Sequence, residues 1–160
     1  MMSVQVLDMK VSVPRFGQGP GVPIPVGLIS TMPTDNKYDI APGFFQADVG
    51  IYADPLPPNN RIVLNAVIGV IGTSANGQII VKLFKSLDPV EIGVEIADTR
   101  IGFETNAEAY YTIELQIADF NTTSQFNVYN LTAELEPIEK AGASVIGPIS
   151  LTGVAYGPVL

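Results

Sequence analysis

The chain has 160 residues, of which 8 are Lys or Arg and 16 are Asp or Glu, so its formal net charge is −8, and it contains no His, Cys or Trp. These absences exclude disulfide bonds, thiolate nucleophiles, Ser-His-Asp triads and zinc sites built from His or Cys. Binding to nucleic acid needs basic residues along the phosphates, which an isoelectric point near 4.3 does not supply. We therefore expect a protein that is not an enzyme and uses no cofactor.

The N-terminal segment alternates apolar and polar side chains and predicts a strand over 3–13. Its apolar residues are Val4, Val6, Leu7, Met9, Val11 and Val13. We expect residues 1–14 to form an N-terminal strand or arm that pairs with a neighbouring subunit during self-assembly.

Residues 15–27 are rich in Gly and Pro and separate this strand from the rest of the chain. Pro residues favour extended, polyproline-like backbone and supply no amide donor to a sheet. Two interpretations remain open: a surface loop around a sheet edge, which is the more ordinary one, or a tether for the arm. In the second interpretation the hinge residues are Gly17, Gly19, Pro20, Gly21, Pro23 and Pro25. Residues 28–160 are expected to form a single β-sandwich domain.

Asp35, Asn36 and Asp39 place three oxygen-bearing side chains in one short segment. Calcium binds oxygen ligands of this kind, which makes these residues weak candidates for a metal site. The segment lacks the spacing and the glycine of an EF-hand, and Lys37 lies inside it. A solvated turn is the favoured interpretation, and we expect no metal.

Period-two alternation recurs through the rest of the chain and predicts half-buried strands over 45–51, 90–96, 111–117 and 129–135. The segment 61–73 is apolar on both faces, which predicts a central strand covered on each side. The Asn76-Gly77 pair tolerates positive φ and predicts a hairpin turn. We therefore expect 61–73 to pair directly with 78–85.

The last apolar stretch, 144–156, is rich in β-branched residues, but Gly147-Pro148 within it predicts a bulge or a sheet edge. Tyr110 and Tyr111 are adjacent in a strand, so one of them should point outward and is an interface candidate. About 8–10 strands with regularly spaced turn signals predict an all-β fold. The fold class we expect is an antiparallel two-sheet β-sandwich of jelly-roll type.

Three stretches carry a family resemblance: VLNAVIGVIG within 61–73, YYTIELQIADF over 110–120 and SVIGPISLTGVAYG over 144–157. In their general residue pattern, these stretches resemble the small jelly-roll proteins of bacterial endospore surfaces. Those proteins are similar to the tumour-necrosis-factor fold and form trimers, layers or appendage fibres. The resemblance implies a structural protein of the spore surface. The chain lacks the cysteines and the collagen-like Gly-X-Y region that many such proteins carry, so the resemblance does not extend to covalent crosslinking or to a filament tip.

Hydrophobic residues make up 47% of the chain and charged residues 15%, and the mean hydropathy is +0.32. This excess of apolar surface is relieved when subunits bury surface against one another. The main hypothesis is a non-enzymatic structural protein that assembles with itself into a homo-oligomer, layer or fibre on a bacterial spore or cell surface. Two alternatives stay open: a carbohydrate-binding β-sandwich module, and a viral or phage capsid, fibre or decoration protein. A hydrolase that uses only carboxylates ranks last.

The first residues have neither the basic region nor the continuous apolar region of a signal peptide. The longest apolar stretch, 62–72, is too short to span a bilayer as a helix. We therefore expect no membrane span and no nucleic-acid partner. An extracellular or spore-surface location, reached by lysis of the producing cell, is the expected setting.

Overall fold

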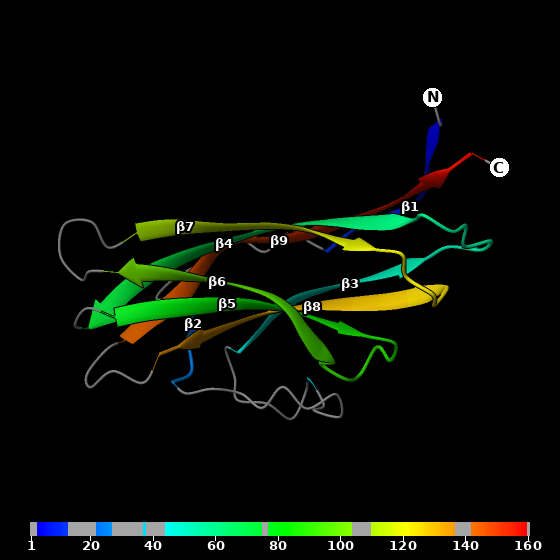
Figure 1. Ribbon diagram of the computed structural model, residues 1–160. Helices are drawn as coiled ribbons and strands as arrows, with labels where there is room; N and C mark the ends of the chain where they lie inside the picture. Colours follow the sequence, from blue (N-terminus) through cyan, green and yellow to red (C-terminus); the bar gives the residue numbers. More distant parts are fainter. Residues whose placement is uncertain are drawn as a thin grey trace.

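Two antiparallel sheets packed face to face make up the described part of the chain in the computed structural model (Figure 1). The structure describes residues 3–12, 22–26, 37, 44–74, 77–103, 110–136 and 142–159. The strands are β1 (Val4–Val11), β2 (Val22–Pro23), β3 (Phe45–Tyr52), β4 (Arg61–Ser74), β5 (Gly77–Ser86), β6 (Val94–Phe103), β7 (Tyr110–Phe120), β8 (Phe126–Leu135) and β9 (Gly142–Pro158). The described residues include no helix that is long and apolar enough to span a bilayer.

Sheet A contains the strands in the order β1-β9-β4-β7, with the short β2 also paired to β9, and sheet B has the order β3-β8-β5-β6. From β3 onward, every connection between consecutive strands passes from one sheet to the other, except the one that joins β5 to β6. This is the arrangement of a two-sheet jelly roll, so the predicted fold class is confirmed.

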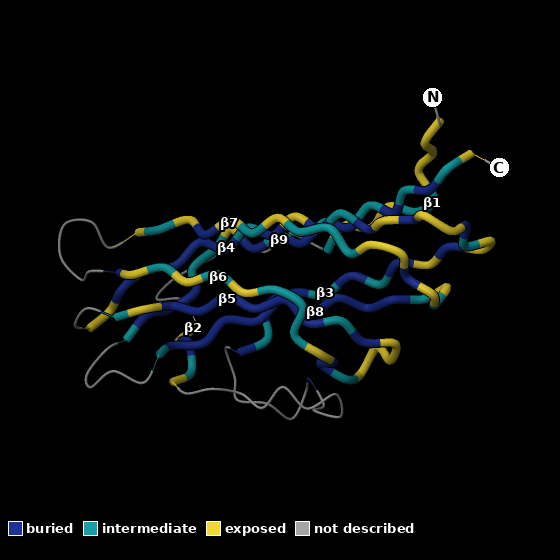
Figure 2. The backbone as a smooth tube through the Cα atoms, viewed as in Figure 1, coloured by how far each residue is buried: buried dark blue, intermediate teal, exposed yellow. Residues whose placement is uncertain are grey.

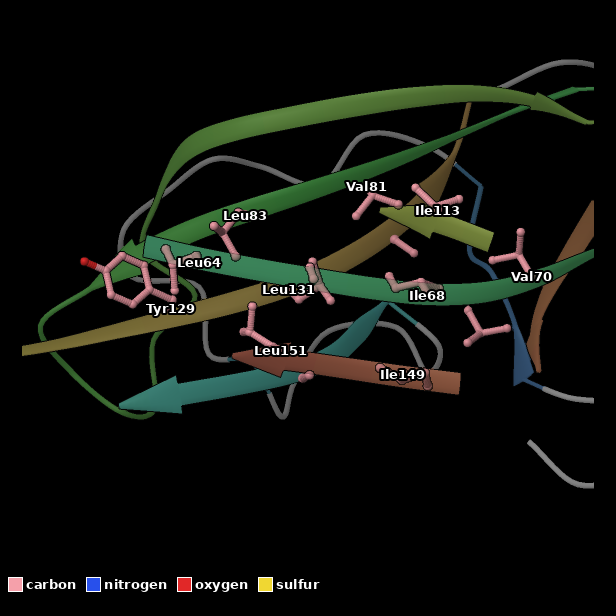
Figure 3. Packing of buried hydrophobic residues seen from close by; sticks show 14 of the residues in the cluster. Leu64, Ile68, Val70, Val81, Leu83, Ile113, Tyr129, Leu131, Ile149 and Leu151 are labelled. Atoms are coloured by element: carbon pink, nitrogen blue, oxygen red, sulfur yellow. The ribbon is translucent and has the colours of Figure 1, made fainter. Parts of the chain in front are cut away.

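Alternate residues of each strand fill the space between the sheets, as the period-two pattern requires. Figure 3 shows this packing for buried residues of β4, β5, β8 and β9, among them Leu64, Ile68, Leu83, Leu131 and Leu151. Each of these five side chains is almost completely buried. Full burial of such a side chain contributes about 1.5–3 kcal/mol, so the inner faces supply most of the driving force for folding.

The expected direct pairing of 61–73 with 78–85 is wrong. β4 pairs with β7 and β9 in sheet A, whereas β5 pairs with β6 and β8 in sheet B. An Asn-Gly pair indicates only that the chain reverses direction, and it carries no information about which sheet the next strand joins. Both neighbours of β4 come from later in the chain, beyond the reach of a local signal.

The Gly147-Pro148 pair lies at a bulge inside β9 and not at a sheet edge. The register between β4 and β9 shifts between Ile68 and Val70, and Gly147 has a φ of 92°. A Cβ at Gly69 would lie 2.0 Å from the carbonyl oxygen of Gly147. Glycine at position 69 therefore allows β4 to approach the bulge, and no larger residue fits there.

The N-terminal strand belongs to sheet A. β1 pairs with β9 of the same chain from Val4, opposite Pro158, to Val11, opposite Thr152. β2 pairs with another part of β9, and Leu135 at the end of β8 donates a backbone hydrogen bond to Pro25. An exchange of β1 between subunits would make the same contacts, so the swapped arm stays a prediction.

Candidate functional site

The outward-facing residues of sheet A line up in rows across its four long strands, because paired residues of neighbouring strands point to the same side. From the strand registers, the rows are Val6, Tyr156, Arg61 and Phe120; then Met9, Val154, Val63 and Ala118; then Val11, Thr152, Asn65 and Gln116; and finally Ser150, Val67 and Glu114. We call these residues the outer face of sheet A.

Much of this face is apolar and open. The exposed fractions are 58% for both Val6 and Met9 and 65% for Phe120. Figure 2 shows exposed and half-buried residues along β1, β4, β7 and β9, in contrast to the buried strands β5 and β8. The expectation that β4 is central is confirmed, but its outward residues are exposed or half-buried, so the described chain covers only one of its faces.

Only two residues of the outer face of sheet A are charged, Arg61 and Glu114. The Arg61 guanidinium lies 5.2 Å from the centre of the Tyr156 ring, a cation–π distance. Beside Arg61 and Tyr156, a hollow of about 320 Å³ opens at the end of the face. Its wall also includes Val4 and Phe120. Tyr and Arg are residue types enriched among those that contribute most to protein interfaces.

The outward-facing side of sheet B is different, because its residues in the central strands β5 and β8 are largely buried and include polar side chains. Its fully or almost fully buried residues include Lys82, Asn130, Thr132 and Glu134. Lys82 Nζ lies 2.6 Å from Glu134 Oε1 and 3.9 Å from Glu95 Oε1. Burial, assisted by the nearby carboxylates of Asp98 and Glu134, raises the pKa of Glu95 above its ordinary value, although Lys82 opposes the shift.

The β5–β6 connection of the same chain covers part of this side of sheet B. The Asn130 amide donates hydrogen bonds to the carbonyls of Glu91 and Ile92, at 3.1 and 3.0 Å, so the β5–β6 connection folds over the sheet. The Lys37 backbone N–H donates to the Val90 carbonyl, so Lys37 lies against this connection. The predicted strand over 90–96 therefore has the wrong bounds: β6 begins later, at Val94, and extends to Phe103, and Ile92 belongs to the cover instead.

A separate cluster of polar side chains lies between the two sheets. The Tyr129 hydroxyl donates to Asp119 Oδ2 at 2.6 Å, and Lys85 Nζ lies 2.7 Å from the same oxygen. Burial and the neighbouring carboxylate raise the pKa of Tyr129, so its hydroxyl stays protonated and acts as a donor. Figure 3 shows the Tyr129 hydroxyl at one end of the apolar core. These contacts join β5, β7 and β8 and stabilise that end of the sandwich.

The arm residues Val4, Val6, Met9 and Val11 all point outward, whereas Leu7 packs against the core. Tyr110 is the outward member of its pair, with 72% of its surface exposed, and Tyr111 is half-buried. The hinge residues Pro23 and Pro25 lie in and beside β2. Outside the described residues lie Val13, Gly17, Gly19, Pro20 and Gly21, as well as the weak metal candidates Asp35, Asn36 and Asp39.

The sequence interpretation missed most of the outer face of sheet A. The sequence predicts a covered strand for 61–73 and a bulge or a sheet edge for 144–156. The outward residues of these strands, which alternate with core residues, are Val63, Val67, Val154 and Tyr156. The signal was the presence of apolar residues on both sides of β4. That signal shows that a strand needs cover on both sides, but not whether the second cover comes from the same chain.

No family model matches the chain, and no curated protein matches it either. Among solved structures, the Eiger TNF of S. frugiperda is similar with 9% sequence identity and a TM-score of 0.45, over 92% of this chain and 91% of that one. A CBM4 structure is similar with 13% identity and a TM-score of 0.34, over 71% of this chain and 61% of that one. These likenesses concern the jelly-roll fold alone.

Proposed function

We propose that this protein is a non-enzymatic structural protein that assembles with itself through the outer face of sheet A. The observation that carries the proposal is the apolar, open character of that face, with Val6, Met9 and Phe120 each more than half exposed. Large exposed apolar patches on soluble proteins mark interaction surfaces. The occupant that fits best is a second copy of the same chain.

The size of the face suits such a contact. Four strands about 4.8 Å apart and eight residues with a rise of about 3.4 Å give a projected area of about 500 Å². Projecting side chains make the accessible area larger than this projection, and each partner in a standard interface buries ~800 Å². With only Arg61 and Glu114 charged, the face does not oppose a copy of itself, even though each subunit carries a net charge of −8.

The test is the mass of the particle in solution, measured by size-exclusion chromatography with light scattering. We expect a discrete oligomer or a larger assembly, and we expect Val63→Glu to shift it towards single chains. Val94→Glu is the matched control, because Val94 is an exposed strand residue of sheet B and 52% exposed. A wild-type protein that is a single chain at high concentration, or a Val63→Glu variant that assembles as the wild type does, would refute the proposal.

The setting we propose is a layer or fibre on a bacterial spore or cell surface, which the resemblance of the strand segments implies. Negative-stain microscopy of the purified protein distinguishes closed rings or trimers from sheets and filaments. Antibody labelling of intact spores of the producing organism tests the location. Labelling of a virion or phage particle instead would favour the alternative of a capsid or decoration protein.

A further inference from the structure

A second hollow lies apart from the outer face of sheet A, between the β5–β6 connection and the β7–β8 connection. Its volume is about 680 Å³, within the range of small-molecule sites. The lining residues that matter are Lys85, Asp88, Glu91, Leu87, Val94 and Asn127. None of the residues that line this hollow belongs to the outer face of sheet A.

Asn127, in the wall of this hollow, has a buried polar atom whose hydrogen-bonding capacity is not used within the described chain. It is 98% buried, since only 2% of its surface is exposed. Its amide nitrogen donates to the Ser124 carbonyl at 2.8 Å, but its Oδ1 atom has no hydrogen-bond partner among the described residues. A buried carbonyl without a donor costs free energy, so a donor from outside the chain would satisfy it.

The charges around the hollow select against anionic ligands. Asp88 and Glu91 contribute carboxylates that would repel an anion, whereas the Lys85 ammonium is paired with Asp119 at 2.7 Å. A neutral molecule with hydroxyl donors avoids this repulsion, and these carboxylates and Asn127 Oδ1 would accept its hydrogen bonds.

The rest of the wall is aliphatic. Leu87 and Val94 are 63% and 52% exposed, so apolar surface is available for contact beside the polar groups. A pyranose ring offers hydroxyl donors along its edge and C–H groups on its face. We propose that this hollow binds a neutral sugar of about one ring, with Asn127 Oδ1 accepting a hydroxyl hydrogen bond and the aliphatic wall packing on the ring face.

The experiment is saturation-transfer NMR on the intact protein with five probes: N-acetylglucosamine, galactose and rhamnose as neutral sugars, and butylamine and butyrate as charged molecules of similar size. We expect at least one sugar to receive saturation with a Kd of about 1 mM, the affinity ordinary for so small a ligand. Binding of butylamine or butyrate alone, or of no probe, would overturn the proposal.

Three variants locate the site. Asn127→Leu removes the acceptor and is expected to weaken sugar binding at least ~10-fold, the value of one hydrogen bond of about 1.4 kcal/mol. Leu87→Glu, at an exposed loop position, is expected to weaken binding without disturbing the core, and it keeps the test valid if Asn127→Leu does not fold. Gln116→Leu, on the outer face of sheet A, is the control and should bind as the wild type does. Sugar binding that survives both Asn127→Leu and Leu87→Glu would place the ligand elsewhere and refute the assignment.

The hollow and the outer face of sheet A share no residue, so sugar binding and self-assembly can be tested separately. The NMR titration is repeated with Val63→Glu, which we expect to reduce assembly and leave sugar binding unchanged. Loss of sugar binding in that variant would mean that the ligand needs the assembled particle, contrary to the site assigned here.

Discussion

Met9 offers the most direct measure of the proposed assembly. It lies in the second row of the outer face of sheet A, beside Val154, and 58% of its surface is exposed in the single chain. Full burial of a Met side chain is worth about 1.5–3 kcal/mol, so covering the exposed part contributes about 1–2 kcal/mol at each copy. Met9→Ala removes most of this contribution. For a contact in which one Met9 is buried, the dissociation constant should rise about 5- to 30-fold.

The assay is a dilution series followed by analytical ultracentrifugation, which gives the dissociation constant of wild type and variant under the same conditions. Leu87→Ala is the matched control, because Leu87 is an apolar residue that is 63% exposed but lies in the β5–β6 connection. Met9→Lys should weaken assembly further than Met9→Ala, since it adds the cost of burying a charge. Equal dissociation constants for wild type, Met9→Ala and Met9→Lys would show that the face stays in water, and the reasoning would fail.

Further predictions concern the fold that presents this face. Gly69→Ala should lower the free energy of unfolding by about 2 kcal/mol or more, measured by urea denaturation, because its Cβ would lie 2.0 Å from a backbone carbonyl oxygen. Lys82→Met should cost about 3–5 kcal/mol in the same assay, because it leaves a buried carboxylate without its ammonium, and adding Glu134→Gln should restore part of the loss. Since the pKa of Glu95 is raised in the folded state above its ordinary value of 4.5, its contribution to stability is complete below that value and is lost as the pH rises through the raised pKa. Glu95→Gln should therefore leave the melting temperature unchanged near pH 4 and raise it near pH 7, and a pH-independent difference would contradict the assignment. Deletion of residues 1–13 should lower both the melting temperature and the mass of the assembly, and an unchanged mass would exclude β1 as an assembly element.

The strands and the fold class were predictable because they depend on local pattern. In β4, β7 and β8, apolar residues recur at every second position, and only a two-layer β arrangement buries them all. The outward orientation of Tyr110 follows from the same periodicity. A pattern of this kind can be recognised within one segment, without knowing which strands are its neighbours.

Strand neighbours and surface sites were not predictable, because they depend on contacts between distant segments. Asn76-Gly77 marks a reversal, yet β4 and β5 join different sheets. Asn127 gives no sequence signal, because its importance comes from burial and from an oxygen that finds no donor. The hollow beside it is formed by two connections about 30 residues apart in the chain, which nothing in the local pattern of either one reveals.

The two sides of the sandwich differ in a way that favours assembly over a solitary particle. On sheet B, polar residues such as Lys82, Asn130 and Glu134 are buried, and hydrogen bonds and an ion pair offset part of the cost. On sheet A, Met9 and Phe120 are open to water. A solitary protein gains nothing from hiding its polar side and exposing its apolar side, since both choices cost free energy. The distribution becomes favourable once a second copy covers sheet A, because the apolar face then contributes its burial energy, while the polar residues of sheet B are already covered within the chain.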